Sequence, residues 1–253
     1  MKKIIIVGWK KKKNMNNLII GTLVYNEEHK FLKEYLDKIS QLTNNIVIID
    51  DGSTDNSLSI CSKYTSNISI SERLMTKDES LLRYNLWNEC TKLANNGDYI
   101  LIQDCDELYP DSSIKNFEET LKKANKLQAD SIAFNLYDMW NKKEYREDFP
   151  YWTASKHLWI RCVKYKSNYN YYWNNKKLHC GSLPINSYYN AYASKLQIQH
   201  MAYSTVELRK KKVEFYNNLD PKGQWGIKEQ YNSILDENPT LITFKDNFEE
   251  YNE

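Results

Sequence analysis

Short apolar segments alternate with helix-like segments through the first half of this chain. Residues 18–24 (LIIGTLV), 46–49 (IVII) and 99–103 (YILIQ) have the length and residue types of buried strands. Between them, residues 28–40 and 80–94 carry apolar side chains at helical spacing. Apolar strands that are separated by helices form a parallel sheet with helices on both faces. The pattern therefore predicts an α/β fold with a Rossmann-like, mostly parallel sheet flanked by helices.

The rest of the chain gives weaker signals. We expect an irregular, aromatic extension over residues 139–193 and one more helix after Gln224. A further helix is expected to start at the capping box Ser204-Thr205-Val206-Glu207. The other expected helices are 57–63 and 114–126, and the other expected strands are 68–70, 131–137, 157–163 and 195–199.

Acidic side chains follow two of the predicted strands. Residues 50–55 (DDGSTD) come after the strand at 46–49, and Asp104 and Asp106 come after the strand at 99–103. Ligands of parallel sheets bind beyond the carboxyl ends of the strands, so both acidic segments are expected to line one crevice. Carboxylates at i and i+2 of an extended or turn backbone fall on the same side and suit a divalent cation. The alternative is that the aspartates only cap turns and helices.

Length, charge and cysteine content narrow the class of protein. A chain of 253 residues is long enough for one well-packed domain. Lys and Arg number 35 against 33 Asp and Glu, and the formal charge of +2 gives no general argument for a polyanionic partner. The five cysteines include no C-x-x-C pair, which argues against a disulfide framework or a zinc knuckle. With no segment as long as a membrane span, a soluble, cytoplasmic protein is expected.

Three motifs, in this order and spacing, resemble family 2 glycosyltransferases of the A-type fold. They are residues 24–28 (VYNEE), 47–55 (VIIDDGSTD) and 99–107 (YILIQDCDE), each of which spans the end of a predicted strand. Downstream, residues 178–184 (LHCGSLP) and 200–203 (HMAY) are similar to one bacterial and phage branch of that family. The branch usually has His-x-Gly-Tyr, and Ala202 stands here in place of the glycine. The residues that continue this similarity are Arg209, Lys212, Tyr216, Asp220 and Pro221.

The resemblance implies a nucleotide-sugar donor, with a UDP-sugar as the leading candidate, bound in the crevice. Tyr25, Asn26 and Glu27 would shape the nucleoside pocket. Asp51 would hydrogen-bond the base. Arg83 would approach the nucleotide or its diphosphate, unless it is only a cation on the helix surface.

The resemblance also implies a metal site. Asp104, which would contact the donor as well, and Asp106 would hold Mn²⁺ or Mg²⁺ against the diphosphate, and His200 would complete the metal shell. Such a cation stabilises the charge on the departing nucleoside diphosphate. An imidazole ligand favours Mn²⁺ over Mg²⁺. A structural histidine is the simpler alternative for His200.

The catalytic base is not evident from the sequence. An inverting transferase needs a side chain that takes the proton of the acceptor, and the usual Glu-Asp pair of the family is missing between Gly181 and Gln199. His179, Asp148 and Asp138 are the candidates. A retaining reaction needs no such base, so the stereochemical outcome stays open.

The chain is expected to have three parts. Residues 1–14 form a basic N-terminal extension, residues 15–220 the glycosyltransferase domain, and residues 221–253 a helical C-terminal tail. Within the domain, residues 15–138 are the nucleotide-sugar-binding half and residues 139–220 the acceptor-side half.

The predicted function is metal-dependent transfer of a sugar, expected to be a hexose, from a UDP-sugar. A surface or lipid-linked glycan is the default acceptor, and a protein or hydroxymethylated phage DNA are alternatives. Nucleic acid would suit the basic residues 10–13, the lysines at 210–212 and the aromatic residues 169–173. A solvated helix face explains the lysines at 210–212 more simply.

Two other classes of protein remain open. A nucleotidyltransferase also uses paired carboxylates, but it needs a glycine-rich, basic loop after the first strand, where this chain has Tyr25-Asn26-Glu27-Glu28. A non-catalytic nucleotide- or glycan-binding module would explain the missing base.

Overall fold

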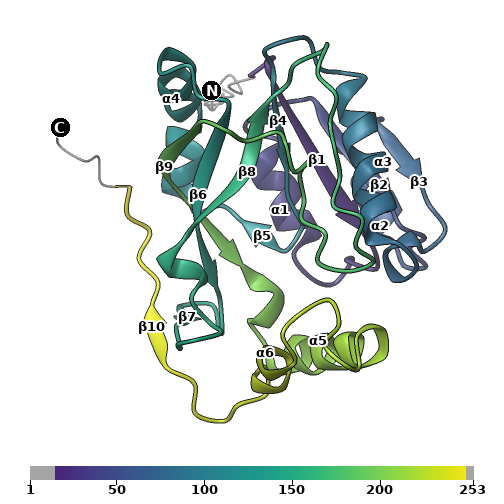
Figure 1. Cartoon of the computed structure of the whole chain (residues 1–253), viewed down its shortest axis with the longest axis vertical. Coiled ribbons are helices and arrows are strands. Elements are labelled where there is room, and N and C mark those ends of the chain that lie inside the picture. The colour runs from purple at the N-terminus through teal and green to yellow at the C-terminus, as the bar shows by residue number, and fades with distance from the viewer. Residues whose placement is uncertain (1–14, 249–253) are drawn as a thin grey trace, which may run out of the picture.

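The computed structural model describes residues 15–248 and has an eight-stranded sheet with helices on both faces (Figure 1). The strand order is β3-β2-β1-β4-β8-β6-β9-β5. These strands are β1 (Leu18–Val24), β2 (Ile46–Asp50), β3 (Ile68–Ile70), β4 (Tyr99–Ile102), β5 (Glu107–Leu108), β6 (Ser131–Asp138), β8 (Leu158–Lys164) and β9 (Ala191–His200). A separate antiparallel pair consists of β7 (Glu144–Arg146) and β10 (Leu241–Thr243). The α-helices are α1 (Leu32–Ile39), α2 (Ser57–Cys61), α3 (Glu79–Thr91), α4 (Asp111–Lys126), α5 (Val206–Leu219) and α6 (Lys228–Ser233), and the 3-10 helices are η1 (Leu74–Thr76), η2 (Ala154–Lys156) and η3 (Met201–Tyr203).

The central strand β1 is buried on both of its faces. Leu18 and Ile20 pack with apolar side chains of α1, α2 and α4, whereas Ile19 and Leu23 pack with those of α3. Alternate side chains of a strand point to opposite faces, which explains why this segment is apolar at consecutive positions. Gly21 lets α3 approach closely, because a Cβ there would lie 2.5 Å from Cys90 Sγ.

The sheet has a parallel half and a mixed half. β1 pairs in parallel with both β2 and β4, and β2 pairs in parallel with β3. β8 runs antiparallel between β4 and β6, while β6 and β9 are parallel. The predicted α/β fold with a mostly parallel sheet is confirmed, although the antiparallel placement of β8 was not expected. The carboxyl ends of β1, β2 and β4 therefore lie side by side at the same end of the sheet.

The C-terminal region differs in detail from the sequence prediction. The N-cap of α5 is Thr205, whose hydroxyl accepts a hydrogen bond from the Leu208 amide, so the predicted capping box at Ser204 is one residue early. The predicted later helix is α6, and α5 and α6 lie together beyond one end of the sheet (Figure 1). After α6 the chain forms β10, a strand that differs from the predicted helical tail over residues 221–253. Strand β10 forms because β7 offers it a partner more than ninety residues earlier in the chain.

Some expectations fall outside the described part of the chain. The predicted basic extension, residues 1–14, with its lysines at 10–13, is not among the described residues. Within residues 15–248 we find no helix with the length and apolarity needed to span a bilayer.

Candidate active site

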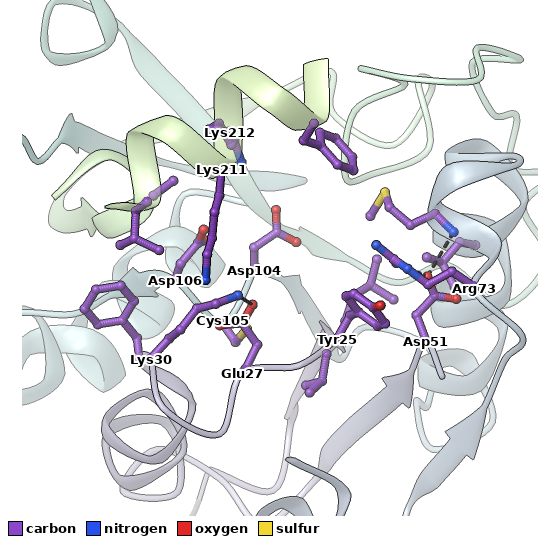
Figure 2. Close-up of a pocket in the computed structure, with 18 of the residues that line it drawn as sticks. Tyr25, Glu27, Lys30, Asp51, Arg73, Asp104, Cys105, Asp106, Lys211 and Lys212 are labelled. Atoms are coloured by element: carbon purple, nitrogen blue, oxygen red, sulfur yellow. Dashed lines mark hydrogen bonds and ion pairs between the residues drawn. The ribbon is translucent and has the colours of Figure 1, made fainter. Parts of the chain in front are cut away.

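A first cavity of about 270 Å³ opens at the carboxyl ends of β1, β2 and β4 (Figure 2). The loop after β1 forms one wall, and α5 supplies the opposite wall, from which Lys211 and Lys212 reach inward. The sequence prediction that both acidic segments line one crevice is confirmed, because Asp51, Asp104 and Asp106 all line this cavity.

The loop after β1 is fixed by hydrogen bonds to the loop after β2. Asn26 has a left-handed backbone with a φ of 50°, its amide donates to Ser53 Oγ, and its side-chain oxygen accepts from the Thr54 amide. Asparagine tolerates this backbone better than most residues. Asn26 therefore shapes the pocket by joining two loops, and Tyr25 and Glu27, not Asn26, are the predicted residues that line the cavity.

Glu27 is an acidic side chain with one free oxygen. Its Oε1 accepts a hydrogen bond from Lys30 Nζ at 2.6 Å, whereas its Oε2 is buried without a hydrogen-bond partner among the described residues. Burial raises the pKa of Glu27 to about 7 although Lys30 opposes the shift. This carboxyl group therefore titrates near neutral pH.

Asp51 is buried and fully engaged by the segment that follows β3. Its carboxylate accepts hydrogen bonds from the amides of Leu74 and Met75, from Ser71 Oγ and from Arg73 Nη1. Arg73 has a left-handed backbone, with a φ of 54°. Asp51 thus holds a loop in place, and any contact to a base would share oxygens that already accept these bonds.

Arg73 was not predicted from the sequence. Its guanidinium lies 3.3 Å from the centre of the Tyr25 ring, and both residues line the cavity beside Asp51 (Figure 2). An arginine stacked on tyrosine gives a flat, cationic surface. Residue 73 is brought there by a loop whose course depends on Asp51, and no local motif marks it.

Arg83 of α3 pairs with Asp104. Its Nη1 and Nη2 donate to the two carboxylate oxygens of Asp104 at 2.6 and 3.1 Å, and Glu79 Oε1 lies 3.3 Å from Arg83 Nε. Partial loss of solvent contact raises the pKa of Asp104, but the adjacent guanidinium of Arg83 outweighs it and holds this pKa below its usual range. Asp104 is ionised and committed to Arg83.

Asp106 and His200 lie close together. His200 Nε2 lies 4.0 Å from Asp106 Oδ2, and its Nδ1 is hydrogen-bonded to Asp138 Oδ1 at 2.7 Å. Burial lowers the pKa of His200, but the hydrogen bond to Asp138 and the charge of Asp106 raise it to about 9. Asp106 Oδ1 is buried without a hydrogen-bond partner in the described part of the chain.

Asp106 and His200 fit a divalent cation better than the predicted set of Asp104, Asp106 and His200 does. A carboxylate that holds the far nitrogen of an imidazole is the usual support of a metal-binding histidine, and Asp138 supplies it. Within residues 15–248, however, no three His, Cys, Asp or Glu side chains are grouped closely enough to form a metal site. Arg83 engages both carboxylate oxygens of Asp104, so Asp106 and His200 are the candidate ligands.

His179 lines a second cavity, of about 410 Å³, that shares Met75, Arg83, Asp104, Lys212 and Phe215 with the first. The backbone of His179 is left-handed, with a φ of 57°, and its amide donates to Glu79 Oε2 at 2.7 Å. Its Nε2 lies 2.6 Å from the Tyr231 hydroxyl, which also contacts Asp220 at 3.2 Å. Strained backbones of this kind are concentrated at functional sites. Burial lowers the pKa of His179.

Asp148 is not brought to either cavity. It accepts hydrogen bonds from Arg146 Nε at 2.6 Å and from the Thr240 amide at 3.0 Å, next to the β7–β10 pair. Asp148 therefore joins two distant segments of the chain. The third candidate base, Asp138, is hydrogen-bonded to His200.

Lys212 also lines the cavities, although a solvated helix face was expected for residues 210–212. Lys210 and Lys211 are exposed, while Lys212 is half-buried and lines both cavities. The pKa of Lys212 is raised by the Tyr216 hydroxyl and, against burial, by Asp106 and Asp104. The family resemblance includes Lys212, but helical spacing alone does not distinguish residue 212 from its neighbours, because α5 has no strong apolar face.

Comparison with known proteins identifies the family. The sequence profile of Glycosyl transferase family 2 matches residues 19–190, more than half of the chain. Curated protein sequences give no match. Two crystal structures of S. aureus TarS 1–349, the second in complex with UDP, align over 86% of this chain and 69% of theirs, at 15% and 14% identity and TM-scores of 0.44 and 0.49. A 4-diphosphocytidyl-2C-methyl-D-erythritol synthase aligns over 62% of this chain and 76% of its own, at 13% identity and a TM-score of 0.34. With its profile match and its cavity at the ends of β1, β2 and β4, the chain belongs to glycosyltransferase family 2 and has the A-type fold that its motifs predict.

Proposed function

We propose that this protein is a metal-dependent hexosyltransferase that uses a UDP-sugar as donor. The observation that carries the proposal is the junction of the two cavities, where Asp104 lines both the cavity at the ends of β1, β2 and β4 and the cavity of His179. Beside it lie a carboxylate oxygen of Asp106 that lacks a hydrogen-bond partner among the described residues and an imidazole that Asp138 orients. A donor on one side and an acceptor on the other would meet at this junction.

The first cavity suits the nucleoside and diphosphate of the donor. The Arg73–Tyr25 stack offers a flat surface for a base at one end of the cavity. Glu27 Oε2 is a hydrogen-bond acceptor that still needs a donor, and ribose or base groups would supply one. The diphosphate would then lie toward Asp106 and Lys212, at the other end.

Asp106 and His200 would hold Mn²⁺ or Mg²⁺ at the diphosphate end. The bound cation would supply charge neutralisation for the departing nucleoside diphosphate. Asp138 orients His200 by holding Nδ1, which leaves Nε2 on the side of Asp106. Arg83 keeps Asp104 ionised and fixed at the point where the two cavities meet.

The second cavity suits the acceptor, and His179 is the proposed base. A lowered pKa keeps the imidazole neutral at neutral pH, as a proton acceptor must be. In an inverting reaction the acceptor oxygen forms the new bond to the anomeric carbon, its proton passes to His179, and the bond to the nucleoside diphosphate breaks. Tyr231 holds the ring in place.

A donor screen tests this function. The protein is incubated with UDP-, GDP- and TDP-sugars and Mn²⁺, and thermal shifts and release of the nucleoside diphosphate are recorded with and without EDTA. We expect UDP-sugars to stabilise the protein and to be turned over only when the metal is present. Donor hydrolysis that is unaffected by EDTA contradicts the metal role. Pyrophosphate release from a nucleoside triphosphate would indicate a nucleotidyltransferase, and binding without turnover on any acceptor pool would indicate a binding module.

A further inference from the structure

Lys212 is a half-buried cation that lines both cavities. It lies on α5, and its ammonium group is 6.0 Å from the centre of the Tyr203 ring and 5.7 Å from that of Tyr216. Within residues 15–248, this ammonium makes no hydrogen bond or ion pair. A half-buried ammonium without an anion in contact is unfavourable unless a ligand supplies the anion.

The neighbouring carboxylates are largely occupied by other cations. Asp104 is paired with Arg83, and Glu27 is paired with Lys30. Of the three described carboxylates whose charge acts on Lys212, Asp106 is the one that no Lys or Arg pairs with, and it is a candidate metal ligand. Once a divalent cation neutralises Asp106, every carboxylate among the described residues that line the first cavity is engaged by a cation other than Lys212.

We infer that Lys212 binds the diphosphate of the donor and stabilises the nucleoside diphosphate as it leaves. The inference rests on the proposed function and adds to it a specific diphosphate-binding residue that reaches the site from α5, on the wall opposite β1 (Figure 2). An ammonium that contacts a phosphate oxygen makes a charge-assisted hydrogen bond, which is stronger than a neutral one. The charge on that oxygen grows as the sugar departs, so the contact strengthens along the reaction.

The position of Lys212 also predicts that metal and nucleotide affect each other's binding affinity. In the absence of nucleotide, Lys212 and a cation at Asp106 are two positive charges in one cavity and repel each other. A diphosphate interacts favourably with both charges. Each ligand should therefore raise the affinity for the other, and Lys212 should contribute to this coupling.

The lysines at 210–212 provide a matched set of variants. Titration calorimetry compares UDP with uridine for the wild type, Lys212→Met, Lys212→Arg and Lys210→Met, and electron paramagnetic resonance of free Mn²⁺ gives the affinity for Mn²⁺ alone. For Lys212→Met we expect UDP affinity to fall about ten- to hundredfold, with uridine affinity within about twofold of wild type. Mn²⁺ alone should bind Lys212→Met more tightly. Lys212→Arg should recover most of the UDP affinity, and exposed Lys210→Met should match the wild type.

The outcomes separate the possible failures. A misfolded Lys212→Met variant would lose affinity for UDP, uridine and Mn²⁺ alike. In that case the Lys212→Arg variant decides between the outcomes. Wild-type affinity of Lys212→Arg for UDP supports the inference, and an affinity as low as that of Lys212→Met overturns it. Unchanged UDP affinity in a folded Lys212→Met variant overturns the inference and leaves the proposed function standing. A wild-type protein that binds no nucleoside diphosphate overturns both.

Discussion

The guanidinium of Arg83 donates to both carboxylate oxygens of Asp104, at 2.6 and 3.1 Å. This pairing gives the two aspartates of the Asp-x-Asp motif different environments. Asp104 is paired with the Arg83 guanidinium, whereas Asp106 keeps one buried oxygen without a hydrogen-bond partner in the described part of the chain. The motif therefore joins one residue that organises the junction of the cavities to one that is available to a metal.

This difference predicts unequal effects on metal binding. Asp106→Asn should weaken Mn²⁺ binding in the presence of UDP by more than about tenfold, because it removes the negative charge of a ligand. Asp104→Asn should weaken it by about twofold or less, because the amide oxygen still accepts from Arg83. Titration calorimetry with Mn²⁺ measures both values. Equal losses in the two variants would show that Asp104 is also a ligand.

The Arg83 pairing predicts a large effect on stability. Arg83→Ala should lower the free energy of unfolding by roughly 3 kcal/mol, because Glu79 is left buried without its cation. Asp104 contributes less to this loss, since its side chain is 42% exposed and is solvated in the variant. Urea unfolding measures the change, and Lys92→Ala, which removes the exposed pair with Glu89, serves as the control. The prediction is wrong if the two variants lose similar amounts.

Much of this site could be predicted from sequence. The strands, the acidic residues that follow two of them and the Asp104–Asp106 spacing are local patterns. Neighbouring residues are enough to specify a buried strand and the turn after it. Arg73 could not be found in this way, and Lys212, which the family resemblance includes, could not be given a place in the site. Their places depend on a loop that Asp51 holds and on how α5 packs, which are contacts between residues far apart in the chain.

The same limit applies to the candidate bases. The sequence offers His179, Asp148 and Asp138 as candidates without deciding between them. The tertiary contact with Thr240 holds Asp148 away from both cavities, whereas the contacts with Glu79 and Tyr231 fix His179 inside one.

Glu27 predicts a pH dependence of stability. Its pKa in the folded protein is about 7, above the ordinary value of 4.5, so the folded state holds its proton more tightly than the unfolded state does. The resulting stabilisation is fully present below about pH 4.5 and is lost as the pH rises through about 7, by at most roughly 3 kcal/mol. Glu27→Gln should remove this decline and be more stable than the wild type at about pH 8.

Urea unfolding of Glu27→Gln between about pH 5 and pH 8 checks this behaviour. The exposed residue Glu119 gives a control, since Glu119→Gln should leave the difference between the two pH values unchanged. If the wild type and Glu27→Gln decline in parallel, Glu27 does not titrate in this range.

Gly226 lies against the residues that hold His179, and a methyl group there should impair catalysis. A Cβ at this position would lie 1.9 Å from the Tyr231 hydroxyl oxygen and 2.9 Å from His179 Nε2. The loop cannot easily move away, because Asp220 accepts hydrogen bonds from three of its amides, those of Gln224, Trp225 and Gly226. The Tyr231 ring is also stacked on Tyr216, with ring centres 4.2 Å apart. Gly226→Ala must therefore displace Tyr231 and His179 together.

The expected result is a selective loss in kcat. Gly226→Ala should lower kcat about ten- to hundredfold, as a misplaced proton acceptor would, while UDP affinity stays within about twofold because His179 does not line the first cavity. Steady-state kinetics and UDP titration measure the two effects. Gly97→Ala is the control. Gly97 has a positive φ, of 93°, so an alanine there is strained, but it lines neither cavity, and this change should reduce stability without reducing kcat. A Gly226→Ala enzyme with wild-type kcat would remove His179 from the reaction.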